Sequence, residues 1–151
     1  MQRLLGSVAN QQMTLSNMGK VALKGFQRTL AHFPTIEIPG SCIMPNHIHF
    51  ITFVTDIGRG GVSPPSYPKG EVTSPLPKVA LGKIVAFYKY HTTKEINALW
   101  STPGSRFWQR NYYERVIRNE HEFEAIHDYI ETNPLNWERD EYYSNERFRR
   151  S

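Results

Sequence analysis

The chain has 151 residues, a formal net charge of +4 and 39% hydrophobic residues. This length predicts a single domain over residues 1–151 that can bury its own hydrophobic core. No apolar run reaches the ~18 residues that a membrane span requires, and the N-terminus lacks the apolar stretch of a signal peptide. We therefore expect no membrane partner. The single cysteine, Cys42, excludes a disulfide framework and fits a reducing cytoplasm.

The N-terminal part of the chain predicts an extended lead-in followed by a helix. Residues 1–13 give weak signals and fit no regular element. From Thr14 onward, apolar residues recur at three- and four-residue steps, which is typical of an amphipathic helix. Ser16 or Asn17 would cap this helix, and Pro34 would end it.

Two strands and a long loop are expected next. Residues 35–43 alternate polar and apolar side chains, with a break at the Pro-Gly pair, and residues 44–54 are rich in β-branched and aromatic side chains. They form a plausible antiparallel pair. Residues 56–77 contain four glycines and five prolines, a composition that predicts a flexible loop inserted within one domain.

The C-terminal half predicts two further helices around an aromatic strand. Helical spacing returns over residues 79–99, and Asn119 is a candidate cap for a helix that ends near Thr132. Between them, residues 107–109 and 112–117 have the aromatic and β-branched content of strands. The tail is polar and basic, and we expect it to fray.

The segment around His47 and His49 carries the first chemical signal. Side chains alternate along a strand, so the two imidazoles point to one face while Ile48 and Phe50 point to the other. Their Cβ atoms are then expected to lie roughly 7 Å apart. Two imidazoles at this spacing can converge on one divalent metal. The alternative is a pair of histidines that form hydrogen bonds at the sheet surface.

Tyr129 and Asn133 carry the second signal. They are four residues apart and therefore lie on one face of the predicted helix. A tyrosine hydroxyl becomes a useful nucleophile toward a phosphate whose charge a metal neutralises. The amide oxygen of Asn133 would be a third ligand, and mixed nitrogen and oxygen ligation suits Mg²⁺ or Mn²⁺. Alternatively, Tyr129 packs in the core and Asn133 caps the helix end.

Basic and aromatic residues alternate in two stretches, residues 87–91 and residues 106–113. This pattern suits single-stranded nucleic acid, because cations bind phosphates and rings stack on bases. The alternative is a half-buried aromatic strand with charged outer residues. The candidate DNA-binding residues are Lys83, Lys89, Arg106, Trp108, Arg110, Tyr112 and Arg115.

Three motifs in this order resemble a known family. Residues 44–49 (MPNHIH), residues 108–118 (WQRNYYERVIR) and residues 129–134 (YIETNP) resemble the single-tyrosine transposases of the HUH superfamily, and among them the REP-associated tyrosine transposases. The resemblance extends from about residue 4 to about residue 139 and is interrupted by the loop at residues 56–77.

The resemblance implies an α+β domain with a ferredoxin-like antiparallel sheet that acts on single-stranded or hairpin DNA in the bacterial cytoplasm. It assigns His47, His49 and Asn133 to a Mg²⁺ or Mn²⁺ site and Tyr129 to the nucleophile. The tyrosine would form a 5′-phosphotyrosine bond and release a 3′-hydroxyl, and another 3′-hydroxyl would then rejoin the strands.

One departure from the family pattern affects these expectations. Family members begin with an apolar strand that belongs to the central sheet, whereas this chain starts beyond most of it. Either the start of the sequence is late, or the domain lacks this strand, or another chain fills the gap. An unpaired sheet edge would cost stability and invite association, so a homodimer is a candidate assembly. A hairpin-binding module without cleavage activity is the alternative function. A small hydrolase unrelated to DNA would need a further acid or base, for which only His127 and Glu131 are nearby.

Overall fold

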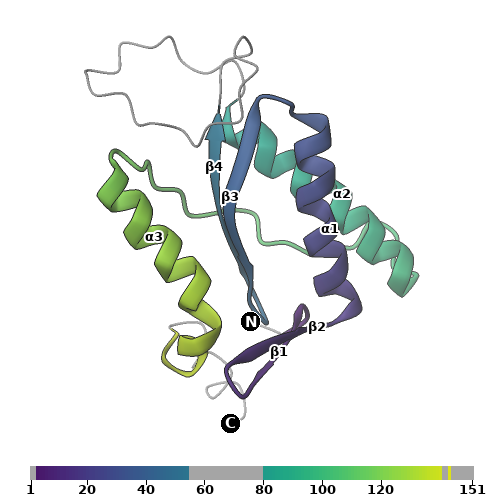
Figure 1. The fold of residues 1–151 in the computed structure, drawn as a ribbon. Coiled ribbons are helices and arrows are strands. Elements are labelled where there is room, and N and C mark those ends of the chain that lie inside the picture. The colour runs from purple at the N-terminus through teal and green to yellow at the C-terminus, as the bar shows by residue number, and fades with distance from the viewer. Residues whose placement is uncertain (1–2, 55–79, 141–142, 144–151) are drawn as a thin grey trace.

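The computed structural model describes residues 3–54, 80–140 and 143 (Figure 1). The loop predicted at residues 56–77 and the basic tail lie outside these residues. In chain order the elements are β1 (Gly6–Ala9), β2 (Gln12–Leu15), α1 (Asn17–His32), β3 (Ile36–Ile43), β4 (Ile48–Val54), α2 (Leu81–Trp100), α3 (Glu120–Thr132) and the 3₁₀ helix η1 (Asn133–Arg139). The fold is α+β, as the sequence predicts.

The strands β3 and β4 form the antiparallel pair at the centre of the fold. Their register pairs Cys42 with His49 and Ile43 with Ile48. An irregularity between Glu37 and Gly40 shifts the register, at the point where proline has no N–H for the ladder. The expected strand pair is confirmed, and its arrangement with the helices is compatible with a ferredoxin-like fold.

The N-terminal residues form a second small hairpin, β1 with β2, in place of the expected lead-in. Asn10 and Gln11 connect the strands with φ values of 50° and 62°, the left-handed pair that a tight two-residue hairpin turn requires. The helix α1 consequently begins later than Thr14. Ser16 is its N-cap, and the Ser16 hydroxyl accepts a hydrogen bond from the Gly19 amide at 3.1 Å.

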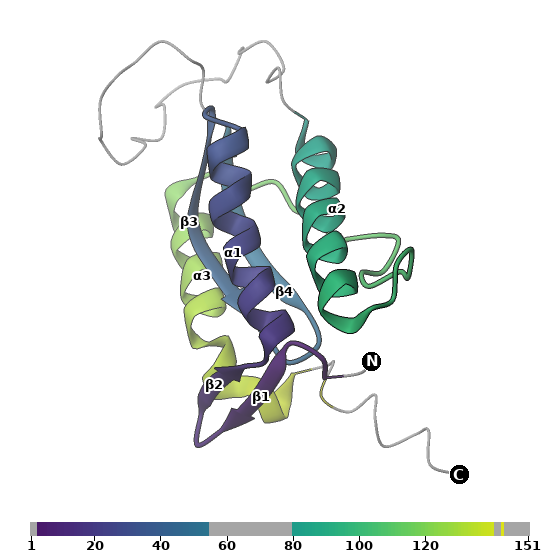
Figure 2. The same cartoon turned by 90° about the vertical axis from the view of Figure 1, so that its right-hand side faces the viewer.

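The helices cover both faces of the β3–β4 hairpin, with α1 and α2 on one face and α3 on the other (Figures 1 and 2). On the first face, the ring of Phe26 packs against Phe50 and Tyr88. The buried Tyr88 hydroxyl donates a hydrogen bond to the Ala22 carbonyl at 2.8 Å, which ties α2 to α1. This core holds the hairpin, and with it the two histidines, in a fixed position.

The strands predicted at residues 107–109 and 112–117 are wrong, because residues 101–118 contain neither helix nor strand. Phe107 and Trp108 do pack against the core cluster, so their aromatic content reflects side-chain packing and not a ladder. Within the part of the chain that the structure describes, β4 pairs with β3 alone. The aromatic segment therefore adds no strand to this sheet.

Candidate active site

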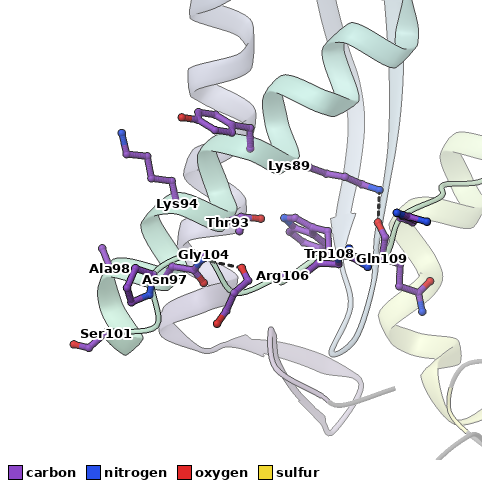
Figure 3. A pocket seen from close by; sticks show the side chains of 14 residues that line it. Lys89, Thr93, Lys94, Asn97, Ala98, Ser101, Gly104, Arg106, Trp108 and Gln109 are labelled. Atoms are coloured by element: carbon purple, nitrogen blue, oxygen red, sulfur yellow. Dashed lines mark hydrogen bonds between the residues drawn. The ribbon is translucent and has the colours of Figure 1, made fainter.

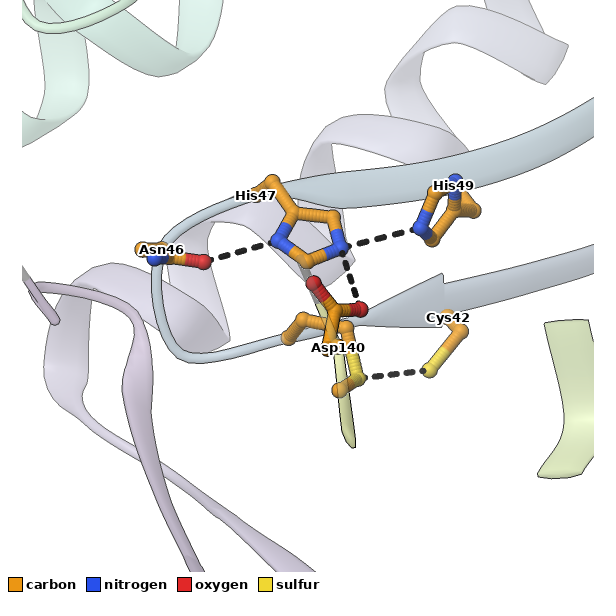
Figure 4. Close-up of polar contacts among 6 residues, drawn as sticks. Cys42, Asn46, His47, His49 and Asp140 are labelled. Atoms are coloured by element: carbon orange, nitrogen blue, oxygen red, sulfur yellow. Dashed lines mark hydrogen bonds and ion pairs between the residues drawn. The ribbon is translucent and has the colours of Figure 1, made fainter. Parts of the chain in front are cut away.

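The turn between β3 and β4 brings His47 and His49 together (Figure 4). His49 belongs to β4, whereas His47 lies in the turn one residue before the strand begins. The Nε2 atoms of the two rings are 2.9 Å apart, and the ring planes are nearly perpendicular. Two imidazole nitrogens thus meet at one point.

The buried Asn46 fixes the tautomer of His47. The Asn46 Oδ1 atom lies 2.7 Å from His47 Nδ1, and because a carbonyl oxygen can only accept, His47 Nδ1 carries the proton. The lone pair of His47 Nε2 then points toward His49, whose Nε2–H donates to it. A metal-ligating histidine has the same arrangement, with the distal N–H held by an oxygen.

Asp140 approaches the same nitrogen of His47 that contacts His49, with 3.8 Å between the Asp140 Oδ2 atom and His47 Nε2. Both side chains are largely buried, at 11% exposure for His47 and 5% for Asp140. Burial, with a smaller effect from His49, lowers the pKa of His47 to about 4, although Asp140 acts in the opposite direction. The imidazole is therefore neutral at neutral pH and keeps a lone pair for a ligand.

Tyr129 of α3 faces this histidine pair. Its ring packs edge-to-face on His49 with 5.6 Å between the ring centroids, and 55% of the residue is exposed. A tyrosine with this exposure is not a core residue, so the core-packing alternative does not apply. The phenol lies where a substrate could approach it from solvent.

The position of α3 depends on contacts at both of its ends. Near its start, Phe123 packs on Phe53 of β4, and the Asn119 side chain caps the helix by accepting from the Glu122 amide at 2.8 Å. Glu122 accepts in turn from the Arg118 amide and from Arg115. These hydrogen bonds, the Arg118 amide foremost, lower the pKa of Glu122.

At the other end of α3, Asn133 is buried with 3% exposure. Its Nδ2 atom has no hydrogen-bond partner among the described residues, which is unusual for a buried amide. The helix η1 begins at Asn133 and places Trp137 with its ring 6.1 Å from the ring of His47. Asn133 is thus the C-cap of α3 and the first residue of η1, the helix that brings Trp137 near His47.

These donors fit a divalent metal by their chemistry. His47 and His49 supply two converging nitrogens. The unpaired atom of the buried Asn133 is its amide nitrogen, which is a donor, so only the amide oxygen of Asn133 could be a metal ligand. No group of three His, Cys, Asp or Glu side chains suited to a metal occurs among the described residues. A third ligand from the described residues would consequently have to be of another type, such as an amide oxygen.

Sequence reasoning missed Asn46 and Asp140 as parts of this site. Asn46 directly precedes His47, so its proximity was a usable signal. Asp140 follows η1, a helix that the sequence pattern does not predict. The approach of Asp140 to His47 depends on the tertiary fold.

The candidate DNA-binding residues divide into two groups. Lys89, Arg106, Trp108 and Arg110 line one groove beside α2, whereas Lys83, Tyr112 and Arg115 do not. Lys89 has a structural role, because its ammonium donates to the carbonyls of Gln109 and Asn111 at 2.9 and 3.2 Å. Arg115 is engaged with Glu122 at 3.2 Å.

None of the described helices is long and apolar enough to cross a bilayer. No protein-family model matches the chain, and no solved structure matches it significantly.

Two proteins of Haemophilus influenzae are similar to the chain. One, described as an uncharacterized protein, is 32% identical over 144 residues, which span 93% of this chain and 77% of that protein. The other bears the name "Putative REP-associated tyrosine transposase" and is 27% identical over 110 residues. That match covers 73% of this chain and 55% of the relative's length. The chain therefore belongs to the family of the uncharacterized Haemophilus protein and is distantly related to the transposase-named protein.

Proposed function

We propose that this protein cuts and rejoins single-stranded DNA with Tyr129 as its nucleophile. The observation that carries the proposal is the contact between the exposed Tyr129 ring and His49, whose Nε2 atom meets that of His47. A nucleophile and a pair of candidate metal ligands thus share one surface. The distant relation to a transposase-named protein supports the same chemistry.

His47 and His49, with the amide of Asn133, would hold a divalent cation such as Mg²⁺ or Mn²⁺. When bound there, the metal supplies charge neutralisation at the scissile phosphate. Asn46 keeps the Nδ1 proton of His47 in place, so that His47 Nε2 remains a lone-pair donor. The ring of Trp137 lies near that of His47, with 6.1 Å between the ring centroids, and His47 is largely buried.

The reaction forms one bond and breaks one bond at phosphorus. The Tyr129 oxygen attacks the phosphate as its hydroxyl proton is lost, and the bond from phosphorus to the 3′-oxygen breaks. The departing strand takes up a proton and leaves with a 3′-hydroxyl. The downstream strand stays attached to Tyr129 through its 5′-phosphate. A 3′-hydroxyl then attacks the phosphotyrosine, which restores the phenol and needs no external energy source.

The test is a denaturing gel of the protein after incubation with Mn²⁺ and a pool of hairpin oligonucleotides with randomised flanks. The label is placed at either the 3′ or the 5′ end. We expect the 3′ label to migrate with the protein and the 5′ label to be released, because the tyrosine keeps the 5′-phosphate.

The variant Tyr129→Phe should abolish this adduct, and Tyr113→Phe should retain it. Tyr113 is the matched control because it is 88% exposed and lies on another segment. An adduct that persists in Tyr129→Phe would refute the assigned nucleophile. Binding of the hairpin without any adduct in the wild type would favour a hairpin-binding module.

A further inference from the structure

The segment that follows α2 folds back along that helix and forms a groove with it (Figure 3). The groove has a volume of about 720 Å³ and is lined by α2 residues and by residues between Ser101 and Arg110. It contains neither Tyr129 nor the histidines.

Side chains from successive turns of α2 hold this wall in place. The Asn97 amide donates to the Ser105 carbonyl at 2.8 Å. The Trp108 indole N–H donates to the Thr92 hydroxyl at 2.7 Å, and the Lys89 ammonium bridges the Gln109 and Asn111 carbonyls. The groove is therefore preformed, and a ligand would not have to order the segment on binding.

The charge of the groove is of one sign. Its lining includes Lys89, Lys94, Arg106 and Arg110 and no acidic residue. Lys94, Arg106 and Arg110 are exposed, and none of the three forms an ion pair within the described residues. Three cations that are available to a ligand thus surround a concave surface, which is the arrangement that attracts a polyanion.

Aromatic residues alternate with these cations along the chain. Trp108 lines the groove with its ring orientation fixed by the bond to Thr92, and Tyr90 lines it with 63% of the residue exposed. Rings interleaved with cations are typical of sites for single-stranded nucleic acid, where bases stack on rings and phosphates contact basic side chains. A duplex would offer phosphates but no accessible base faces.

We propose that this groove binds a single-stranded segment of DNA, with Lys94, Arg106 and Arg110 on its phosphates and Tyr90 and Trp108 beneath its bases. The identity of the nucleic acid as DNA rests on the proposed function. Lys89 acts as a positioning residue that holds the groove wall.

The experiment measures the affinity of the protein for fluorescein-labelled dT₁₅ by anisotropy. The test variant is Lys94→Glu/Arg106→Glu. The control, Lys20→Glu/Lys24→Glu, makes the same charge change at exposed residues of α1 that do not line the groove. We expect at least a 10-fold loss of affinity in the test variant and less than a 3-fold loss in the control.

Salt dependence provides a second measurement. The slope of log K against log salt should become shallower by about 1.4 in the test variant, because two phosphate contacts are lost at ~0.7 each for a single strand. Should the test variant unfold, Lys94→Gln/Arg106→Gln replaces it, and the same order of affinities is expected.

Equal losses in the test and control variants would overturn the proposal, because they would indicate general electrostatic attraction. No loss in either variant, or no binding of dT₁₅ by the wild type, would also overturn it. Tighter binding of rU₁₅ than of dT₁₅ would refute the assignment to DNA. Failure of the proposed function is distinguishable, since Tyr129→Phe should bind dT₁₅ as the wild type does whether or not an adduct forms.

Discussion

At the scale of single residues, the chemistry depends on which nitrogen of His47 carries the proton. Asn46 Oδ1 accepts from Nδ1, and this leaves the Nε2 lone pair of His47 directed at His49. In the absence of a metal, the His49 Nε2–H fills this position. Binding of a cation between the rings would require His49 to carry its proton on Nδ1 instead. Both imidazoles must also be neutral to bind the cation, so metal affinity should fall as the pH is lowered far enough to protonate them.

We expect Mn²⁺ to raise the melting temperature of the wild type, because a ligand that binds only the native state stabilises it. The gain is about 2.7 kcal/mol at a concentration 100-fold above Kd. The variants His47→Gln and His49→Gln should lose most of this shift. His121→Gln, at an exposed position of α3, is the control and should keep it. Equal shifts in all four proteins by thermal denaturation would show that the cation binds elsewhere.

The sequence predicts His47, His49 and Tyr129 as site residues because each motif is local and its spacing can be read directly. It did not identify Asp140, because no pattern in a sequence reveals that a residue after η1 will approach a turn almost a hundred residues earlier. The buried side chains that shift the pKa of a residue are brought to it by the tertiary fold, so they can be identified only once the structure is known.

At the scale of elements, the close approach of α1 and α2 supports both candidate sites. Gly25 lies where an added Cβ atom would be 2.5 Å from the Thr92 methyl and 2.8 Å from the Tyr88 ring. Thr92 also fixes Trp108 in the groove. A side chain at position 25 would therefore disturb the packing of the helices and the groove wall together.

Gly25→Ala should destabilise the protein by about 1–3 kcal/mol, because it overpacks the contact between the helices. Gly82→Ala is the matched control in a helix, since the nearest atom to its added Cβ is 3.6 Å away. The control should be neutral, or more stable by up to ~1 kcal/mol from helix propensity. Urea denaturation measures both, and a Gly25→Ala variant as stable as the wild type would contradict the described packing.

The helices and the β3–β4 pair were predictable because their apolar periodicity and caps are local. Ser16 and Asn119 both act as the caps that the sequence suggests. Residues 107–117 were not predictable in the same way. Aromatic side chains favour strands but also suit core packing. In the structure the side chains of Phe107 and Trp108 pack on the core while the segment forms no ladder.

At the scale of the whole molecule, the β3–β4 hairpin separates the two candidate sites. The helix α3 and Tyr129 lie on one face, and α1 and α2 lie on the other, with the groove beside α2 (Figure 2). In the two proposals taken together, the face with α3 cleaves the DNA and the groove beside α2 binds a single-stranded segment of it. Four residues of the groove were among the predicted DNA-binding residues. The groove itself was not predictable, because its wall depends on hydrogen bonds between α2 and the segment that follows it.

The global stability should decrease as the pH falls below about 6.5 in the presence of a chelator. The pKa of His47 is lowered from 6.5 to about 4, so over this window the unfolded chain binds a proton that the native state does not. The part of this loss that comes from His47 should level off below pH 4, at about 3.4 kcal/mol. His47→Gln should remove this component, and parallel curves of stability against pH for the two proteins would contradict the lowered pKa.

The central claim, that Tyr129 forms a covalent bond to DNA, can be tested most directly by mass spectrometry of the trypsin-digested adduct. Cleavage after Arg118 and Arg139 yields the peptide 119–139, in which Tyr129 is the only tyrosine, whereas Tyr112 and Tyr113 fall in the peptide 111–115. We expect the nucleotide mass on peptide 119–139 and none on peptide 111–115. Nucleotide mass on peptide 111–115, or an adduct on no tyrosine, would contradict the account.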